Sequence, residues 1–204
     1  KELLDARNIL KKPIVYVKIN DIKSKYVFTA PHSVKQWRNN DFKVADVKTG
    51  VICETLAKIT NSVCISRTQF DKTDPNIDSY ADSEFQQLVV YLVNNKSSRT
   101  LVDVHGLANR DDFDFAVGTR NGNSLYSGDR CVLEKKFTTA INNYAPGTVA
   151  SLNNYNNYDC GFNNVSNAII TKSYNGGALI INTKNNVSVS NFSSVQIEIS
   201  NYYR

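Results

Sequence analysis

The segment Leu101-Val102-Asp103-Val104-His105-Gly106 limits the folds open to this chain more than any other segment. Its apolar residues are typical of a short buried strand, and Gly106 can turn the chain where a larger residue would clash. The polar residues Asp103 and His105 lie toward the C-terminal end of this strand. Ligand sites in open α/β sheets form outside the carboxyl ends of strands. The segment therefore predicts a central strand that ends at a functional site.

Short apolar strands alternate with amphipathic helices along the rest of the chain. Strands are predicted at 14–19, 26–30, 63–66, 101–104, 115–118, 168–171, 178–181 and 195–199. Helices are predicted to begin near Asp46 and near Ser83, and a third to run from Leu133 to Ile141. Residues 33–45 and 151–164 are expected to be irregular, and Asn175-Gly176-Gly177 to form a turn. This alternation favours an α/β fold, a mixed sheet flanked by helices in one domain over residues 1–204.

Composition excludes several classes of function. The 204 residues suit one domain with a sizeable core. The net charge of +5 comes from scattered lysines and arginines, so we expect no nucleic-acid partner. No apolar run approaches the roughly 20 residues of a membrane span. The chain opens at Lys1 rather than Met, which suits a trimmed or a mature form, and a cytoplasmic and a secreted location both stay open.

The cysteines give no metal motif of their own. None of the pairs among Cys53, Cys64, Cys131 and Cys160 has the C-x-x-C spacing of a zinc ribbon. Cys53 and Cys64 lie in apolar segments and are expected to be buried thiols. A disulfide between Cys131 and Cys160 is left open as an alternative to free thiols.

Histidine placement points to a metal. The chain has two histidines, and His32 follows the strand at 26–30 much as His105 ends its own strand. Two strand-end imidazoles suggest one shared ion, and catalytic zinc sites use about three protein ligands with one position left for water. Asp46 is the favoured third ligand, with the N-cap of a helix as its alternative role, and Glu54 is a weaker candidate.

Three further polar residues are candidates for chemistry. Glu198 lies in an otherwise apolar strand, where a carboxylate is costly unless it meets a cation, a metal or a donor; a solvent-facing position is its alternative. Arg67 at a strand end is suited to a substrate carboxylate or an oxyanion, with a surface salt bridge as its alternative. Asp103 shares a strand face with His105 and is expected to orient a ligand, or else to accept a strand-end hydrogen bond.

Four motifs in chain order resemble the N-formylglutamate amidohydrolase family, whose fold is similar to that of the zinc carboxypeptidases. They are Thr29-Ala30-Pro31-His32-Ser33, Ser66-Arg67, Val102-Asp103-Val104-His105-Gly106 and Gln196-Ile197-Glu198-Ile199. The resemblance spans residues 26–204. It implies that His32 and His105 are zinc ligands, that Glu198 is the general base, and that Arg67 binds a substrate carboxylate or an oxyanion.

The chain departs from the family pattern at two places. The segment after the arginine motif usually continues into Asp-x-Asn-Arg, and here it is Asp74-Pro75-Asn76-Ile77. Zinc carboxypeptidases carry His-x-x-Glu, and here Lys35 stands three residues after His32. Asp46 is therefore our substitute for the third ligand.

These observations predict a zinc-dependent amidohydrolase. Its expected substrate is a small molecule or peptide with a carboxylate: an N-acyl amino acid, a cell-wall peptide or a poly-glutamate peptide. Zinc would polarise the scissile carbonyl and lower the pKa of a bound water. Two alternatives remain open: a zinc-dependent peptidoglycan amidase or peptidase, and a non-catalytic binding module that retains the fold.

Overall fold

The computed structural model describes residues 15–19, 24–96, 98–107, 115–120, 123–126, 150–152 and 177–204, together with short helical fragments between 132 and 144. Within this part, seven strands form one sheet in the order β1-β5-β2-β6-β9-β7-β8. They are β1 (Val15–Ile19), β2 (Tyr26–Ala30), β5 (Val63–Arg67), β6 (Thr100–Leu107), β7 (Phe115–Gly118), β8 (Ala150–Leu152) and β9 (Ser193–Ser200). The helices are α2 (Thr49–Ile59), α3 (Glu84–Lys96), α5 (Ala178–Asn186) and the 3-10 turn η1 (Asn201–Tyr203).

The middle of the sheet is parallel. Strands β5, β2, β6 and β9 run in one direction, whereas β1 and β7 are antiparallel to their neighbours β5 and β9. The carboxyl ends of the four parallel strands therefore lie at the same edge. The structure confirms the expected α/β fold with a mixed sheet flanked by helices.

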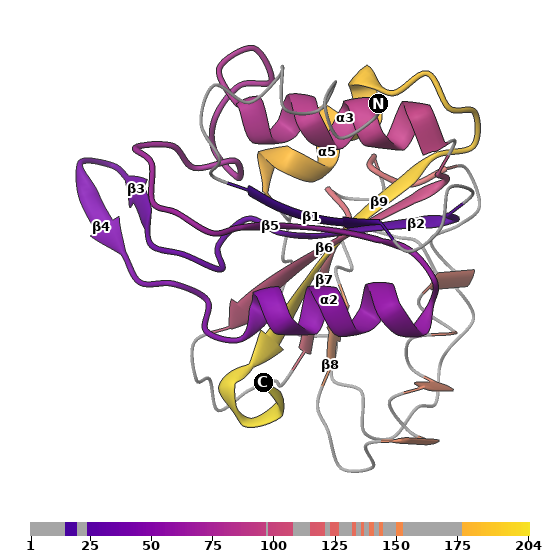
Figure 1. Ribbon diagram of the computed structural model, residues 1–204. Coiled ribbons are helices and arrows are strands. Elements are labelled where there is room, and N and C mark those ends of the chain that lie inside the picture. The colour runs from indigo at the N-terminus through magenta and orange to yellow at the C-terminus, as the bar shows by residue number, and fades with distance from the viewer. Residues whose placement is uncertain are drawn as a thin grey trace.

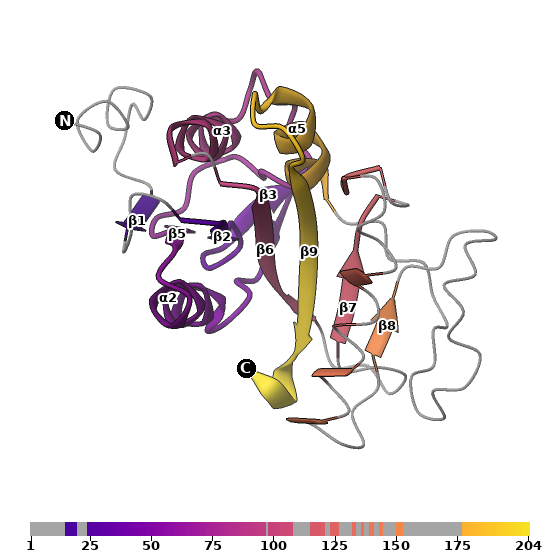
Figure 2. The ribbon, with the colours of Figure 1, turned by 90° about the vertical axis from the view of Figure 1, so that its right-hand side faces the viewer.

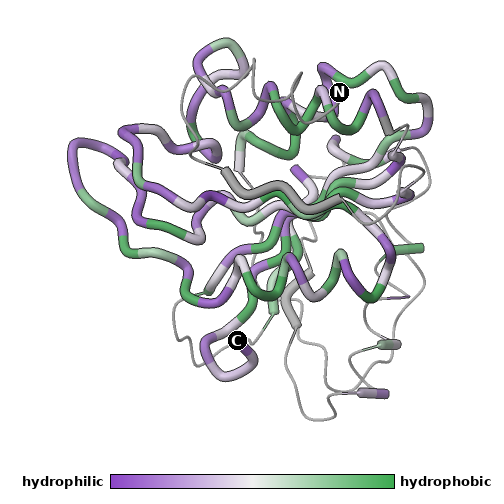
Figure 3. The backbone as a smooth tube through the Cα atoms, viewed as in Figure 1, coloured by the Kyte–Doolittle hydropathy of each residue, from purple (hydrophilic) through white to green (hydrophobic). Residues whose placement is uncertain are grey.

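Helices cover both faces of the sheet (Figures 1 and 2). Helices α3 and α5 pack on one face, where Val27 and Leu101 of the sheet meet Leu88 and Leu179 of the helices. Helix α2 packs on the other face, where Phe28 belongs to the buried cluster. Neighbouring residues of a strand point to opposite faces, so β2 contributes to both layers of the core. Hydrophobic segments concentrate along the central strands, whereas the region of residues 33–45 is mainly hydrophilic (Figure 3).

The predicted strand at 178–181 is wrong, because these residues begin helix α5. A short apolar run does not by itself distinguish a strand from a buried helix. Leu179, Ile180 and Thr183 are buried on the helix, and Asn182 donates to Gln86 Oε1 of α3 at 2.9 Å. Packing against α3 and β9 thus decides the conformation.

The region 33–45 is more regular than predicted. It contains a hairpin of β3 (Gln36–Arg38) and β4 (Asp41–Lys43). The two residues of its turn, Asn39 and Asn40, have φ angles of 53° and 59°. Two successive positive φ angles suit the tight turns of β-hairpins, and asparagine tolerates them better than most residues.

Cys53 and Cys64 are not the separate thiols that we predicted, because they form a disulfide between α2 and β5. Their Cα atoms lie 5.6 Å apart, which is a usual spacing for a disulfide. The apolar surroundings were read correctly, since both side chains belong to the buried cluster under α2. The expected strand at 168–171, most of the third helix, and the Cys131–Cys160 alternative lie outside the described residues.

The turn predicted at Gly106 is also wrong, because β6 continues through it to Leu107. A Cβ at this position would meet the Arg204 guanidinium and would lie 3.0 Å from the Asp46 Cβ. Glycine is therefore needed here for close approach of other groups rather than for a turn. In the described part of the chain, we find no helix whose length and apolar character would let it span a membrane.

Candidate metal centre

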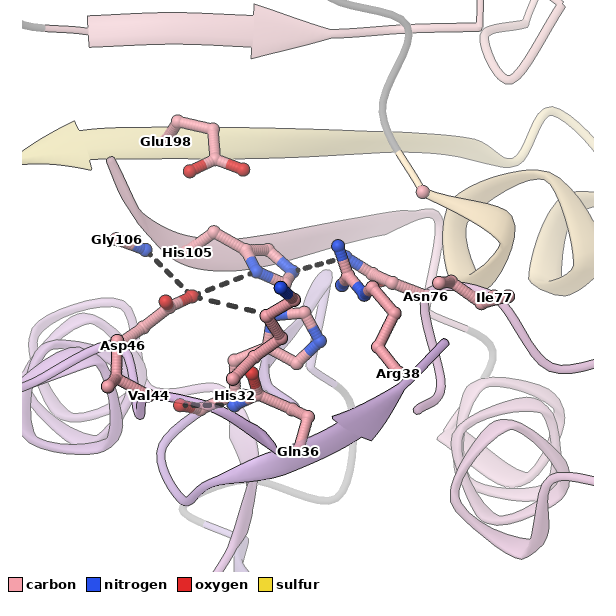
Figure 4. Close-up of a pocket in the computed structure, with 12 residues that line it drawn as sticks. His32, Gln36, Arg38, Val44, Asp46, Asn76, Ile77, His105, Gly106 and Glu198 are labelled. Carbon is pink, nitrogen blue, oxygen red and sulfur yellow. Dashed lines mark hydrogen bonds and ion pairs between the residues drawn. The ribbon is translucent and has the colours of Figure 1, made fainter. Parts of the chain in front are cut away.

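Three predicted ligands from three elements come together at the carboxyl edge of the sheet. His32 follows β2, Asp46 precedes α2, and His105 lies in β6. Asp46 Oδ2 is 3.1 Å from His105 Nδ1 and 3.5 Å from His32 Nδ1. One ligand atom from each residue lies within 4.8 Å of the others, so the three could hold one metal ion. Figure 4 shows both rings directed toward the Asp46 carboxylate.

Each histidine is backed by a second carboxylate at its other ring nitrogen. His32 Nε2 is 2.8 Å from Asp74 Oδ1, and His105 Nε2 is 2.8 Å from Asp103 Oδ2. Asp103 also accepts a hydrogen bond from Thr29 Oγ1 at 2.6 Å, which fixes its orientation. A carboxylate at Nε2 favours the proton on that nitrogen and leaves the Nδ1 lone pair for a metal. The pattern of donors thus fits zinc, which takes imidazole nitrogen and carboxylate oxygen.

Asp46 contributes its side chain to this cluster and not to a helix cap. Helix α2 begins at Thr49, its N-cap residue is Lys48, and no side chain caps it. The backbone N–H of Asp46 donates to His32 O at 2.7 Å, and its Oδ2 accepts the N–H of Gly106 at 3.0 Å. These two bonds fix Asp46 between the histidines, and the missing side chain at Gly106 leaves room for it.

The charged and hydrogen-bonded groups of the cluster shift the pKa values of Asp46 and His105 in opposite directions. Burial by itself would raise the pKa of the Asp46 carboxyl, but its hydrogen bonds to His105 and His32 and their charges hold the pKa far below its usual value. Burial would likewise lower the pKa of His105, yet the adjacent Asp103 carboxylate raises it well above 6.5. The raised pKa favours the positively charged form of the ring, whose charge would compensate the surrounding carboxylates.

The cluster lies in a cavity of about 420 Å³ at the carboxyl edge of the sheet. The cavity is lined by His32, Gln36, Arg38, Lys43, Val44, Asp46, Asn76, Ile77, His105, Gly106, Gly177 and Glu198. Glu198 reaches it from β9, where it pairs with His105 of β6, and it is 8% exposed. Gln196 Nε2 donates to Glu198 Oε1 at 3.0 Å. Glu198 thus faces the cavity from the strand beside His105 and the other candidate metal ligands.

Arg67 does not join the residues that line the cavity. Its side chain is buried, and its guanidinium donates to Thr73 O at 3.1 Å and to Asp71 Oδ1. Burial lowers its pKa, while the neighbouring aspartates act in the opposite direction. The guanidinium therefore holds the loop after β5 and is not directed at the candidate site.

Sequence reasoning missed several residues that the structure brings to the site. Asp74 backs His32, and the Asn76 amide lies 3.1 Å from His105 Nε2. Since that nitrogen directs its proton at Asp103, the amide oxygen of Asn76 is the better atom to face the ring. Ile77, at the arginine position of the family pattern, lines the cavity together with Arg38 from the hairpin. The Asn39-Asn40 pair between Trp37 and Phe42 was the signal for that hairpin.

No protein-family model and no curated protein matches the chain. Among solved structures it is similar to an N-formylglutamate amidohydrolase from Ralstonia eutropha, with 13% identity and a TM-score of 0.54 over 94% of this chain and 87% of that one. A weaker similarity is to a bacteriophage poly-gamma-glutamate hydrolase, with 12% identity and a TM-score of 0.46 over 97% of this chain and 76% of that one. Another is to an N-acetylmuramoyl-L-alanine amidase from Clostridium difficile, with 14% identity and a TM-score of 0.42 over 86% of this chain and 78% of that one. The first similarity shows a shared fold, in agreement with the motif resemblance.

Proposed function

We propose that this protein is a zinc-dependent hydrolase of amide bonds, acting on an N-acyl amino acid or peptide that carries a carboxylate. The observation that carries the proposal is the joint placement of His32, Asp46 and His105 with Glu198 in one cavity. Three metal-ligating side chains and a separate carboxylate are the parts that metal-assisted amide hydrolysis requires.

The three ligands would hold the ion, and the two backing carboxylates would keep both imidazoles in the ligating form. A zinc ion at this place would supply a Lewis acid for the scissile carbonyl and would lower the pKa of a water. Asp74 and Asp103 are each buried, so their hydrogen bonds to the rings are shielded from competing water. The ligands thus keep their orientation without help from the substrate.

Glu198 is the proposed general base. It would accept a proton from the attacking water as the new carbon–oxygen bond forms. It would then return that proton to the leaving amine nitrogen as the carbon–nitrogen bond breaks. One carboxylate serves both steps because it is neutral only between them. The hydrogen bond from Gln196 holds one carboxylate oxygen, which restricts the rotation of the side chain.

The cavity also carries the charge that an acidic substrate needs. Arg38 and Lys43 line it, and the acidic residues among its lining, Asp46 and Glu198, are assigned to metal binding and proton transfer. Arg38 meets Asp74 through Nε and Lys43 meets the exposed Asp41, so the Nη groups of Arg38 and the Lys43 ammonium can still meet an anionic part of the substrate, which supports a carboxylate-bearing amide.

The test combines metal analysis with a substrate panel. Elemental analysis of the purified protein should find one zinc per chain, and N-acyl amino acids with acidic side chains should be hydrolysed. Purified cell-wall fragments, offered in parallel, decide between this activity and a peptidoglycan amidase or peptidase. If the purified protein contains no metal and His32→Ala causes no loss of function, the protein is a non-catalytic binding module and the proposal is overturned.

A further inference from the structure

The β3–β4 hairpin has two chemically different faces. Its register pairs Gln36 with Lys43 and Trp37 with Phe42. Gln36, Arg38 and Lys43 line the cavity, and the alternation of a strand turns the aromatic pair to the other face. Trp37 and Phe42 lie with ring centroids 4.8 Å apart, and Phe70 lies 5.4 Å from Phe42. Aromatic packing thus attaches the hairpin to the loop after β5, and its polar face is presented to the cavity.

Asp74 fixes the position of Arg38 relative to the candidate metal site. Arg38 Nε lies 2.7 Å from Asp74 Oδ2, while Asp74 Oδ1 lies 2.8 Å from His32 Nε2. The carboxylate is 2% exposed, so this bridge is shielded from water. One buried carboxylate therefore sets the guanidinium and a metal ligand at a constant separation.

The rest of the guanidinium is directed at the cavity. Within the described part of the chain, the pairing found for Arg38 is through Nε, and its side chain is 30% exposed. An arginine has five N–H donors, so the two Nη groups keep four of them for a ligand. Two parallel N–H groups match the two oxygens of a carboxylate. Figure 4 shows Arg38 extending from β3, and both Arg38 and Asn76 line the cavity.

The two walls of the cavity differ in charge. Lys43 adds a second cation on the hairpin side, where its pairing with Asp41 is exposed and 3.4 Å long. Such an exposed pair contributes little and leaves the ammonium available. Ile77 lines another part of the cavity and brings no charge. An anionic group in the cavity is therefore attracted to the hairpin.

We propose that Arg38 binds a carboxylate of the substrate through its Nη groups, with Lys43 adding charge, and that the β3–β4 hairpin is the specificity element of the site. The inference rests on the proposed function for the identity of the substrate. Because Asp74 ties Arg38 to His32, the bound carboxylate stands at a set distance from the amide bond that is cleaved. Amides without an acidic group at that distance are poor substrates.

The test measures binding rather than turnover. Glutarate and its monoamide, glutaramate, are titrated into the zinc-loaded protein by calorimetry, since both carry one carboxylate for the metal and only glutarate carries a second. Wild type should bind glutarate at least about 10-fold more tightly, as expected for hydrogen bonds to a charged group. Arg38→Gln should abolish this preference, and Arg38→Lys, which keeps a cation beside Asp74, should retain only part of it.

Lys35→Gln is the matched control. Lys35 precedes the same hairpin and is exposed, and it is not among the residues that line the cavity. Its replacement removes one positive charge and should leave the preference intact. An unchanged preference in Arg38→Gln overturns the proposal, as does an equal loss in Lys35→Gln. If Arg38→Gln fails to fold or to retain zinc, Arg38→Lys decides, because an unchanged preference in that variant excludes the fork-like contact.

The experiments distinguish a failure of the proposed carboxylate-binding role of Arg38 from a failure of the proposed amide hydrolysis. A protein that prefers glutarate through Arg38 but hydrolyses no amide overturns the proposed function and leaves the anion subsite in place. A protein whose activity depends on Glu198 but that cleaves acidic and neutral amides equally well overturns the subsite alone.

Discussion

His105 and Glu198 stand directly opposite each other on the paired parallel strands β6 and β9. Both side chains line the cavity that contains the candidate metal ligands. A ligand and a base on adjacent strands keep a constant spacing, because the backbone hydrogen bonds of the sheet fix it. This relationship is the basis for the first prediction.

Glu198→Gln should lose most of the turnover. The amide keeps the shape and the hydrogen bonding of the side chain but cannot accept the proton, so kcat should fall by about 10²–10⁴-fold. Steady-state kinetics should show little change in KM, and elemental analysis should show retained zinc. Loss of zinc would make Glu198 a ligand, and full activity would remove it from the mechanism.

Asp46→Asn should weaken zinc binding strongly. A neutral amide oxygen is a poorer zinc ligand than a carboxylate, and the loss should exceed the roughly 10–100-fold that removal of an outer hydrogen-bond partner causes. Competition with a chromogenic chelator measures the affinity. Glu54→Gln is the control, since Glu54 lies in α2 and does not line the cavity. Equal affinity in Asp46→Asn and wild type would show that Asp46 is not a ligand.

Zinc uptake by the metal-free protein should release protons. Burial lowers the pKa of His105, but Asp103 raises it well above 6.5, which favours the protonated ring in the metal-free protein. Zinc binds the neutral imidazole, so binding should expel about one proton and should weaken as the pH falls. Calorimetry in two buffers of different ionisation enthalpy gives the number of protons released. Asp103→Asn should reduce that number at pH 7, and an unchanged number would contradict the assignment.

Removal of the Cys53–Cys64 disulfide should destabilise the fold. Replacement of both cysteines by alanine removes a covalent link between α2 and β5 and should lower the free energy of unfolding by about 2–4 kcal/mol. Thermal unfolding with and without reductant checks this, since reduction should lower the Tm of the wild type by more than that of the double variant. Two reactive thiols at these positions in the unreduced, unfolded protein would contradict the disulfide.

The residues of the candidate metal cluster were largely predictable from the sequence, whereas their surroundings were not. His32 follows β2 and His105 lies near the end of β6, both strands that their apolar residues identify, and parallel neighbours bring such ends together. The sequence left two roles for Asp46, a helix cap and a metal ligand. The choice depends on tertiary contacts: Asp46 Oδ2 accepts the N–H of Gly106, and the Asp46 N–H donates to the His32 carbonyl group.

The cationic wall and the disulfide depend on contacts that local patterns do not contain. Arg38 reaches the cavity through a hairpin whose turn of two asparagines was not recognised. Cys53 and Cys64 pair because α2 packs on β5, a tertiary contact. The short apolar run Ala178–Ile181 is compatible with a strand or a helix, and its packing against α3 selects the helix.

The position of β9 has a consequence for how the candidate site is assembled. This strand is the last of the sheet in chain order, yet it lies between β6 and β7 in the interior of the sheet. Before it inserts, both of its neighbours expose unpaired backbone, which is a hazard for association with other chains. Glu198 also arrives only with this strand, so a partly synthesised chain has the candidate metal ligands without the proposed base. The proposed hydrolysis can therefore begin only after β9 has paired with β6 and β7 and has closed their exposed edges.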